Sequence, residues 1–179
     1  HSVATEFDAA ADQVLAALAA LEEAGVRWGC QSVVTYPNDD AGSRRIMAEA
    51  ERLAEKGLPF IQVHRSLGRY NYHGLLNVAT ACIGNSSSGI KETPAFRCPC
   101  INIGSRQRGR LRGDNVIDVG YDTDEIVAAI DRCLNDEVFR AQVRNGTNPY
   151  GAGNAGPRIA DTLAMIALDQ ELVQKKMTY

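Results

Sequence analysis

The sequence predicts an α/β domain with a Rossmann-like, doubly wound parallel sheet, and three observations support this fold class. Helical patterns alternate with short apolar runs along most of the chain, as in parallel sheets with crossover helices. The length of 179 residues and the apolar content of 45% suit one domain with a substantial core. Small polar residues follow several of the strand-like runs, at the sheet edge where such folds bind ligands.

The first half of the chain predicts two helices and two strands. Phe7–Ala24 carries Ala and Leu at spacings of three and four, and Gly25 after it is expected to end the helix. Ala41–Lys56 is amphipathic, and Gly57 supplies a second stop. The intervening β-branched and apolar runs predict strands at Cys30–Tyr36 and Pro59–Val63.

The second half continues the alternation. Tyr72–Ala79 predicts a short helix, followed by an apolar strand at Ala81–Ile83. A long final helix is expected from Pro157, because proline is favoured in the first helical turn. The remaining expected elements are helices at Ser87–Phe96, Thr123–Leu134 and Glu137–Val143, and strands at Pro99–Ile103 and Asn115–Val119.

The segment Gly84–Glu92, with the sequence GNSSSGIKE, is the most informative motif in the chain. It follows an expected strand and opens an expected helix, where unpaired amides and serine hydroxyls favour an anion such as phosphate. Glu92 lies about one and a half helical turns further on, where a carboxylate can accept both hydroxyls of a ribose. On these residues alone, a serine cap on an ordinary surface helix is an equal alternative.

Further motifs extend this pattern. They are His1–Thr5, Pro37–Ser43, Ile101–Arg110 (INIGSRQRGR), Gly113–Ile117 and Tyr150–Ile159. Together with GNSSSGIKE they closely resemble the UDP-N-acetylglucosamine 2-epimerases, specifically the hydrolysing branch of sialic-acid-type pathways. The resemblance covers nearly the whole chain, but only the C-terminal half of such a two-domain enzyme of the glycosyltransferase-B type. It therefore implies one UDP-binding domain over residues 1–179, with the family's N-terminal domain absent.

The resemblance also implies roles for residues around the phosphates. Ser86 and Ser87, with the backbone amides through Ser88 and Gly89, are expected to hold the diphosphate of a UDP-sugar. Gly89 is expected to let the backbone approach the ligand closely. Arg106 is expected to pair with phosphate or sugar, because a planar guanidinium suits a dianion.

A second group of residues is expected around the nucleoside and the leaving group. Glu92 is assigned to the ribose diol, and Leu67 and Tyr72 to the loop that contacts the base. Asn38 sits where a family asparagine reaches the ligand. His1 corresponds to the family histidine near the leaving diphosphate, where it can neutralise charge or donate a hydrogen bond.

Several residues keep a simpler interpretation. Pro-Asn-Asp-Asp around Asn38 is also an ordinary turn and helix cap. His64 and His73 match no family motif and are expected at the surface or in loops. Three arginines after Arg106 resemble an RNA-binding stripe, but without interleaved aromatic residues they are expected to be solvated or ion-paired. These three are Arg108, Arg110 and Arg112.

The chemistry implied by the resemblance is elimination of UDP to a glycal-like intermediate, followed by addition of water. The products are N-acetylmannosamine and UDP. The acid and base that move the C2 proton belong to the N-terminal domain, so this chain alone is expected to fold and bind UDP without turnover. Ser88 and Thr93 favour the hydrolysing branch. A non-hydrolysing epimerase, a glycosyltransferase of the same fold and a non-catalytic nucleotide-binding module are the alternatives.

Composition restricts the remaining functions. The five cysteines form no CxxC pair, so we expect reduced thiols in a cytoplasmic protein rather than a zinc site or a disulfide framework. A net charge of −3 gives no reason to expect nucleic acid. No apolar run approaches the ~20 residues of a membrane span. We expect no metal and no cofactor, and a homo-oligomer for the full-length enzyme.

Overall fold

The computed structural model describes residues 1, 3 and 7–174, which fall into two compact units divided after Pro149. The first unit contains five short strands, β1 (Ser32–Thr35), β2 (Ile61–His64), β3 (Cys82–Gly84), β4 (Cys100–Ile103) and β5 (Val116–Val119). Its α-helices are α1 (Ala10–Trp28), α2 (Ser43–Glu55), α3 (Gly68–Val78), α4 (Ser87–Lys91), α5 (Thr123–Asn135) and α6 (Glu137–Asn145). Two 3-10 turns, η1 (Phe7–Ala9) and η2 (Thr93–Phe96), complete it.

The strands form two parallel ladders, and this confirms the predicted parallel sheet. One ladder joins β1 to β2, and the other has the order β3-β4-β5. In the second ladder Cys82 lies beside Cys100, and Asn102 beside Asp118. Polar residues follow the carboxyl ends of these strands, which lie at the same edge of each ladder because all pairs are parallel.

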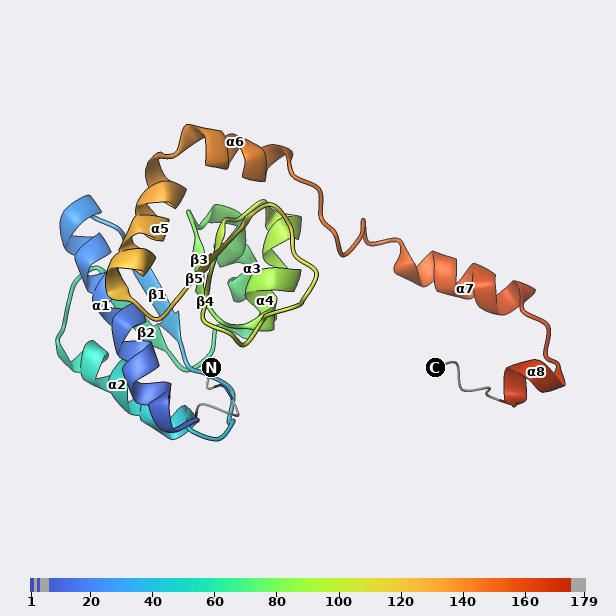
Figure 1. The fold of residues 1–179 in the computed structure, drawn as a ribbon, viewed down its shortest axis with the longest axis horizontal. Helices are drawn as coiled ribbons and strands as arrows, with labels where there is room; N and C mark the ends of the chain where they lie inside the picture. Colours follow the sequence, from blue (N-terminus) through green and yellow to red (C-terminus); the bar gives the residue numbers. More distant parts are fainter. Residues whose placement is uncertain (2, 4–6, 175–179) are drawn as a thin grey trace. The chain divides into compact units, whose positions relative to one another are not determined.

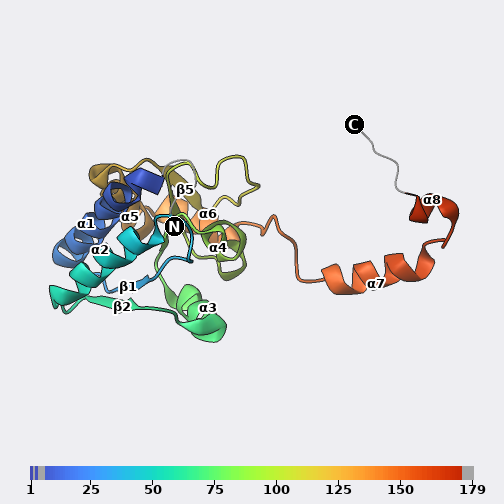
Figure 2. The same cartoon turned by 90° about the horizontal axis from the view of Figure 1, so that it is seen from below.

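Helices cover both faces of the three-stranded ladder, as expected for a doubly wound fold (Figures 1 and 2). Side chains alternate between the two faces of β4. Cys100 faces α4, whereas Ile101 and Ile103 pack with Ile126 and Ile130 of α5 in the main core. All four residues of β4 are buried, so this strand lies at the centre of the hydrophobic core.

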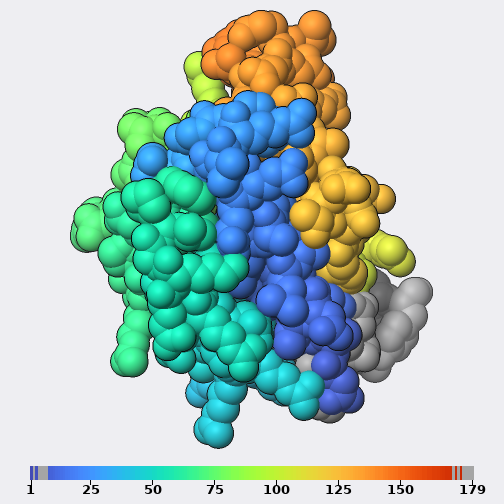
Figure 3. Space-filling view, turned by 90° about the vertical axis from the view of Figure 1, so that its left-hand side faces the viewer, coloured from blue at the N-terminus to red at the C-terminus, as the bar shows by residue number. Residues whose placement is uncertain are grey.

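Helix α1 lies between α2 and α5 on one face of the first unit (Figure 3). The expectation that it ends at Gly25 is wrong, because α1 continues to Trp28 and ends against Gly29, whose φ is 67°. Gly25 instead allows α1 to pack closely against Phe60. A Cβ built at this position would lie 2.1 Å from the Phe60 ring, so only glycine fits where α1 passes this side chain.

The single helix expected over Ser87–Phe96 is also a misprediction. Helix α4 stops at Lys91, and η2 follows it as a separate 3-10 turn. Two neighbouring residues explain the break. Pro94 has no N–H to continue the α-helical hydrogen bonds, and the Thr93 hydroxyl donates to the Gly89 carbonyl at 2.6 Å.

The second unit contains two helices, α7 (Ala155–Met165) and α8 (Gln170–Val173). Helix α7 starts before Pro157 and is shorter than the long final helix expected from the sequence. No residue of α7 is buried, and its apolar side chains Ile159 and Leu163 are exposed. Among the described residues of both units, no helix has the length and apolar character needed to cross a bilayer.

Candidate functional site

A short polar turn links β3 to α4 at the carboxyl edge of the sheet. Ser86 is the N-cap of α4, and its hydroxyl accepts a hydrogen bond from the Ser88 amide at 3.3 Å. This confirms the serine cap. Helix α4 has only five residues, so its dipole is small. The dipole of this helix alone is therefore a weak attraction for an anion, and nearby donors and cations matter more.

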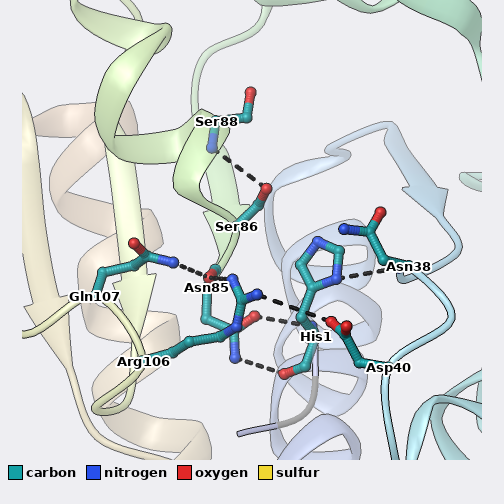
Figure 4. A network of polar contacts seen from close by, with 8 residues as sticks. All are labelled: His1, Asn38, Asp40, Asn85, Ser86, Ser88, Arg106 and Gln107. Carbon is teal, nitrogen blue, oxygen red and sulfur yellow. Dashed lines mark hydrogen bonds and ion pairs between the residues drawn. The ribbon is translucent and has the colours of Figure 1, made fainter.

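Asn85 forms hydrogen bonds with the donors and the cation that lie around the turn. Its backbone carbonyl accepts hydrogen bonds from Arg106 Nη1 at 3.2 Å and from Gln107 Nε2 at 2.8 Å. Its side chain binds the backbone of His1, with Oδ1 accepting from the nitrogen at 2.8 Å and Nδ2 donating to the carbonyl at 2.7 Å. We call these four residues, with Asn38 and Asp40, the Asn85 cluster (Figure 4).

The ring of His1 is oriented by the segment that follows β1. His1 Nδ1 accepts a hydrogen bond from the backbone amide of Asn38 at 3.1 Å. Because Nδ1 acts as an acceptor, a neutral His1 carries its proton on Nε2. The ring therefore presents an N–H donor on the side away from Asn38. Asn38, predicted as a ligand contact, lies beside His1 with an exposed side chain.

Arg106 supplies a cation beside the turn. Its side chain is 28% exposed, and its guanidinium lies 3.8 Å from the carboxylate of Asp40. The backbone carbonyl of Asp40 accepts a hydrogen bond from the Ser43 amide at 3.0 Å, which confirms its predicted turn role. Its contact with Arg106 was not predicted. The Asp40 carboxylate contacts the Arg106 guanidinium without burying it. The guanidinium therefore stays accessible to an anion.

Tyr72 fastens α3 to the first turn of α4. Its hydroxyl lies 2.7 Å from Ser88 Oγ and 3.9 Å from Cys82 Sγ. Burial, the largest contribution, raises the pKa of Tyr72, so this phenol stays neutral at physiological pH. Leu67, the other residue predicted to contact the base, is half-buried at the N-cap of α3.

Glu92 has a partner that the sequence did not indicate. Its Oε2 lies 2.9 Å from Nε2 of His73, and the two side chains are 41% and 36% exposed, respectively. His73 was expected at the surface without a role, and this expectation is incomplete because the residue is half-buried against Glu92. His64 is exposed, as expected, and contacts Gln62.

Gly89 packs α4 against the sheet. A Cβ at Gly89 would lie 2.9 Å from Cys100 Sγ, so the close approach that this glycine permits is to β4. All five cysteines are free thiols. Burial raises the pKa of Cys98 and Cys133 to about 12, which makes these two thiols poor nucleophiles at neutral pH.

Among the arginines after Arg106, Arg112 reaches the Asn85 cluster, because its Nη2 donates to the backbone carbonyl of Gln107 at 2.8 Å. Arg112 pairs with Asp118, whereas Arg108 and Arg110 are exposed. The loop that carries them encloses, with β5 and α5, a cavity of about 1020 Å³ that we call the loop cavity. It is lined by all three arginines together with Asn102, Ala128 and Arg132. No group of acidic, histidine or cysteine residues in the described ranges could hold a metal ion.

The structure thus brings together most of the residues predicted as a site. His1, Asn38, Ser86 and Arg106 meet around Asn85, and Tyr72, Ser88 and Glu92 meet where α3 contacts α4. Sequence reasoning missed Asn85, Gln107, Asp40 and His73. Three of them carried a signal, since Asn85, Gln107 and Asp40 lie inside motifs that were already singled out, whereas His73 lies in none.

The sequence matches the protein family described as UDP-N-acetylglucosamine 2-epimerase over residues 1–164. One relative, the GDP/UDP-N,N′-diacetylbacillosamine 2-epimerase (hydrolyzing) of Campylobacter jejuni, is 43% identical over 86 residues, which are 48% of this chain and 22% of that protein. The UDP-N,N′-diacetylbacillosamine 2-epimerase (hydrolyzing) of Legionella pneumophila is 29% identical over 100% of this chain and 45% of its own length.

A solved structure shows the same fold. The Methanocaldococcus jannaschii UDP-GlcNAc 2-epimerase, in complex with UDP-GlcNAc and UDP, superposes with a TM-score of 0.67 at 18% identity. The superposition covers 86% of this chain and 41% of that protein. The chain therefore spans less than half the length of the relatives it matches.

Proposed function

Because the chain belongs to the UDP-N-acetylglucosamine 2-epimerase family, we propose that it forms the UDP-binding half of a hydrolysing 2-epimerase. The full-length protein would convert UDP-N-acetylglucosamine and water to N-acetylmannosamine and UDP. The observation that carries the proposal is the Asn85 cluster. It places a histidine and an arginine from distant segments at the serine turn.

The diphosphate would lie against the turn that begins α4. Ser86, Ser87 and Ser88 would supply hydroxyl groups as hydrogen-bond donors there, whereas the amide of Gly89 already donates to the Ser86 carbonyl at 3.1 Å. Arg106 supplies the positive charge that the five-residue helix cannot provide alone. Its guanidinium needs little rearrangement, because the Asn85 carbonyl and Asp40 already hold it.

The nucleoside would extend from this turn toward α3. Glu92 would accept hydrogen bonds from the ribose diol through its carboxylate. Leu67, at the N-cap of α3, and the ring of Tyr72 would contact the base. The Tyr72 hydroxyl already bonds Ser88, so we assign the face of this ring, rather than its hydroxyl, to the base.

His1 would assist departure of UDP. Its Nε2–H is free of the contact with Asn38, which occupies Nδ1, and can donate to a phosphate oxygen as negative charge develops. Arg106 would share that charge. The groups that remove and return the C2 proton would come from the part of the enzyme outside this chain.

The hydrolysing outcome is favoured by Ser88 and Thr93 in the motif and by the names of the two curated relatives. We assign the released amino sugar to sialic-acid-type polysaccharide synthesis, in a cytoplasmic homo-oligomer. Product analysis of the full-length protein with UDP-N-acetylglucosamine tests the reaction. Free N-acetylmannosamine with UDP supports it, whereas an epimerised UDP-sugar would show the non-hydrolysing reaction.

The same assay tests which sugar the substrate carries. UDP-N,N′-diacetylbacillosamine is the second substrate to supply, because both relatives are named for it. The 179-residue chain is tested separately by calorimetry with millimolar UDP. We expect binding without UDP-sugar turnover, and the absence of any heat would remove the nucleotide assignment.

A further inference from the structure

We propose that His73 is a positioning residue that holds the Glu92 carboxylate in the orientation that recognises a ribose diol. This inference rests on the proposed function, in which Glu92 binds the ribose, and it adds a specificity-determining residue to that site. His73 lies on α3, whereas Glu92 lies at the end of α4, so the contact joins two helices across the site.

The contact is direct and leaves half of the carboxylate available. His73 Nε2 lies 2.9 Å from Glu92 Oε2. Among the described residues, none forms a hydrogen bond with Oε1 of Glu92. A donor on one oxygen fixes the plane of the carboxylate, and each oxygen can still accept a hydroxyl because a carboxylate oxygen has two lone pairs.

The His73 ring is itself held by packing. Its centroid lies 5.2 Å from the Phe96 ring and 6.1 Å from the Tyr72 ring, both in tilted geometry. Phe96 belongs to η2, which follows Glu92 directly, and Tyr72 bonds Ser88 of α4. The imidazole therefore has two aromatic neighbours, and its Nε2 contacts Glu92.

This arrangement reduces the cost of binding. A half-exposed glutamate at a helix end samples several rotamers, and fixing them on ligand binding costs conformational entropy. With His73 in place, the carboxylate is oriented before the ligand arrives. The benefit applies only to a ligand with both ribose hydroxyls, because only a diol uses both carboxylate oxygens.

The test compares UDP with 2′-deoxy-UDP as calorimetric ligands of the full-length protein. Wild type should prefer UDP by about tenfold or more, as expected for a charge-assisted hydrogen bond. His73→Leu should reduce this preference by about fivefold through weaker UDP binding, while affinity for 2′-deoxy-UDP stays unchanged. His73→Gln, which can present an amide N–H near the same position, should restore most of the preference.

Two controls separate this proposal from simpler explanations. His64→Gln, at an exposed histidine of β2, should leave both affinities unchanged. Equal losses for both ligands in His73→Leu, or an unchanged preference for UDP, would overturn the positioning role. If wild type itself shows no preference and Glu92→Gln binds UDP as wild type does, the ribose assignment of the proposed function fails, and this proposal fails with it.

Discussion

The loop after β4 contributes side chains to both the Asn85 cluster and the loop cavity. The two regions differ in how their polar side chains are held by hydrogen bonds. In the cluster, Arg106 and Gln107 donate to the carbonyl of Asn85, and Gln107 is fully buried. In the loop cavity, Arg108 and Arg110 are exposed, and neither side chain bonds another residue in the described part of the chain.

The difference shows that volume alone does not identify a site. The loop cavity is large, but among the described residues Arg108 and Arg110 lack anchors that would fix their direction. Arg112, by contrast, pairs with Asp118 and donates to the backbone carbonyl of Gln107. In the Asn85 cluster, segments far apart in sequence converge through specific hydrogen bonds. Binding sites need preorganised groups, because ordering side chains during binding costs free energy.

The largest expected effect is a difference in UDP affinity between variants of two arginines in the same loop. Arg106→Ala should weaken UDP binding by at least about tenfold, because a charge-assisted contact contributes ~1.5–3 kcal/mol. Arg108→Ala, in the loop cavity, should change the affinity by less than about twofold. Calorimetry on both variants decides the comparison, and equal losses would show that the arginines act only through net charge.

The packing beneath the site gives the second prediction. Gly89→Ala should lower the free energy of unfolding by about 1–3 kcal/mol, because the new Cβ would lie 2.9 Å from Cys100 Sγ. Urea denaturation measures the loss, and adding Cys100→Ala should recover part of it. Gly74→Ala is the matched control, since nothing lies within 4 Å of a Cβ at this α3 position. A loss at Gly74 as large as that at Gly89 would argue against the steric explanation.

A smaller effect is expected where α3 contacts α4. Tyr72→Phe and Ser88→Ala each remove one hydroxyl from the 2.7 Å hydrogen bond, so each should cost about 0.5–1.5 kcal/mol of stability. The double variant should cost less than the sum, because both changes break the same bond. Strict additivity in a double-mutant cycle would mean that the two hydroxyls do not interact.

The smallest effect is expected in the loop cavity. Ala128→Trp places a large side chain at an exposed position that lines this cavity. UDP affinity should stay within about twofold of wild type, and stability within about 0.5 kcal/mol. Loss of UDP binding in this variant would indicate that the nucleotide binds in the loop cavity rather than at the Asn85 cluster.

Local signals predicted the elements well, except where a neighbour in space overrode them. A strand was expected over Pro99–Ile103, because an apolar run between turn residues is a local property, and β4 covers Cys100–Ile103. Gly25 was misread as a helix stop, because the approach of Phe60 that requires glycine there is a tertiary contact. Pro94 did carry a local signal against one continuous helix, and that signal was overlooked.

The sequence by itself determined the α/β class, the serine turn and most of the candidate ligand residues, because periodicity and motifs are written along the chain. Only the tertiary structure decided that Asn85 joins the segments of the candidate site, that Asn38 contacts the His1 ring, and that His73 contacts Glu92. These contacts join residues that are distant in sequence, and folding brings them together through packing that no single segment specifies.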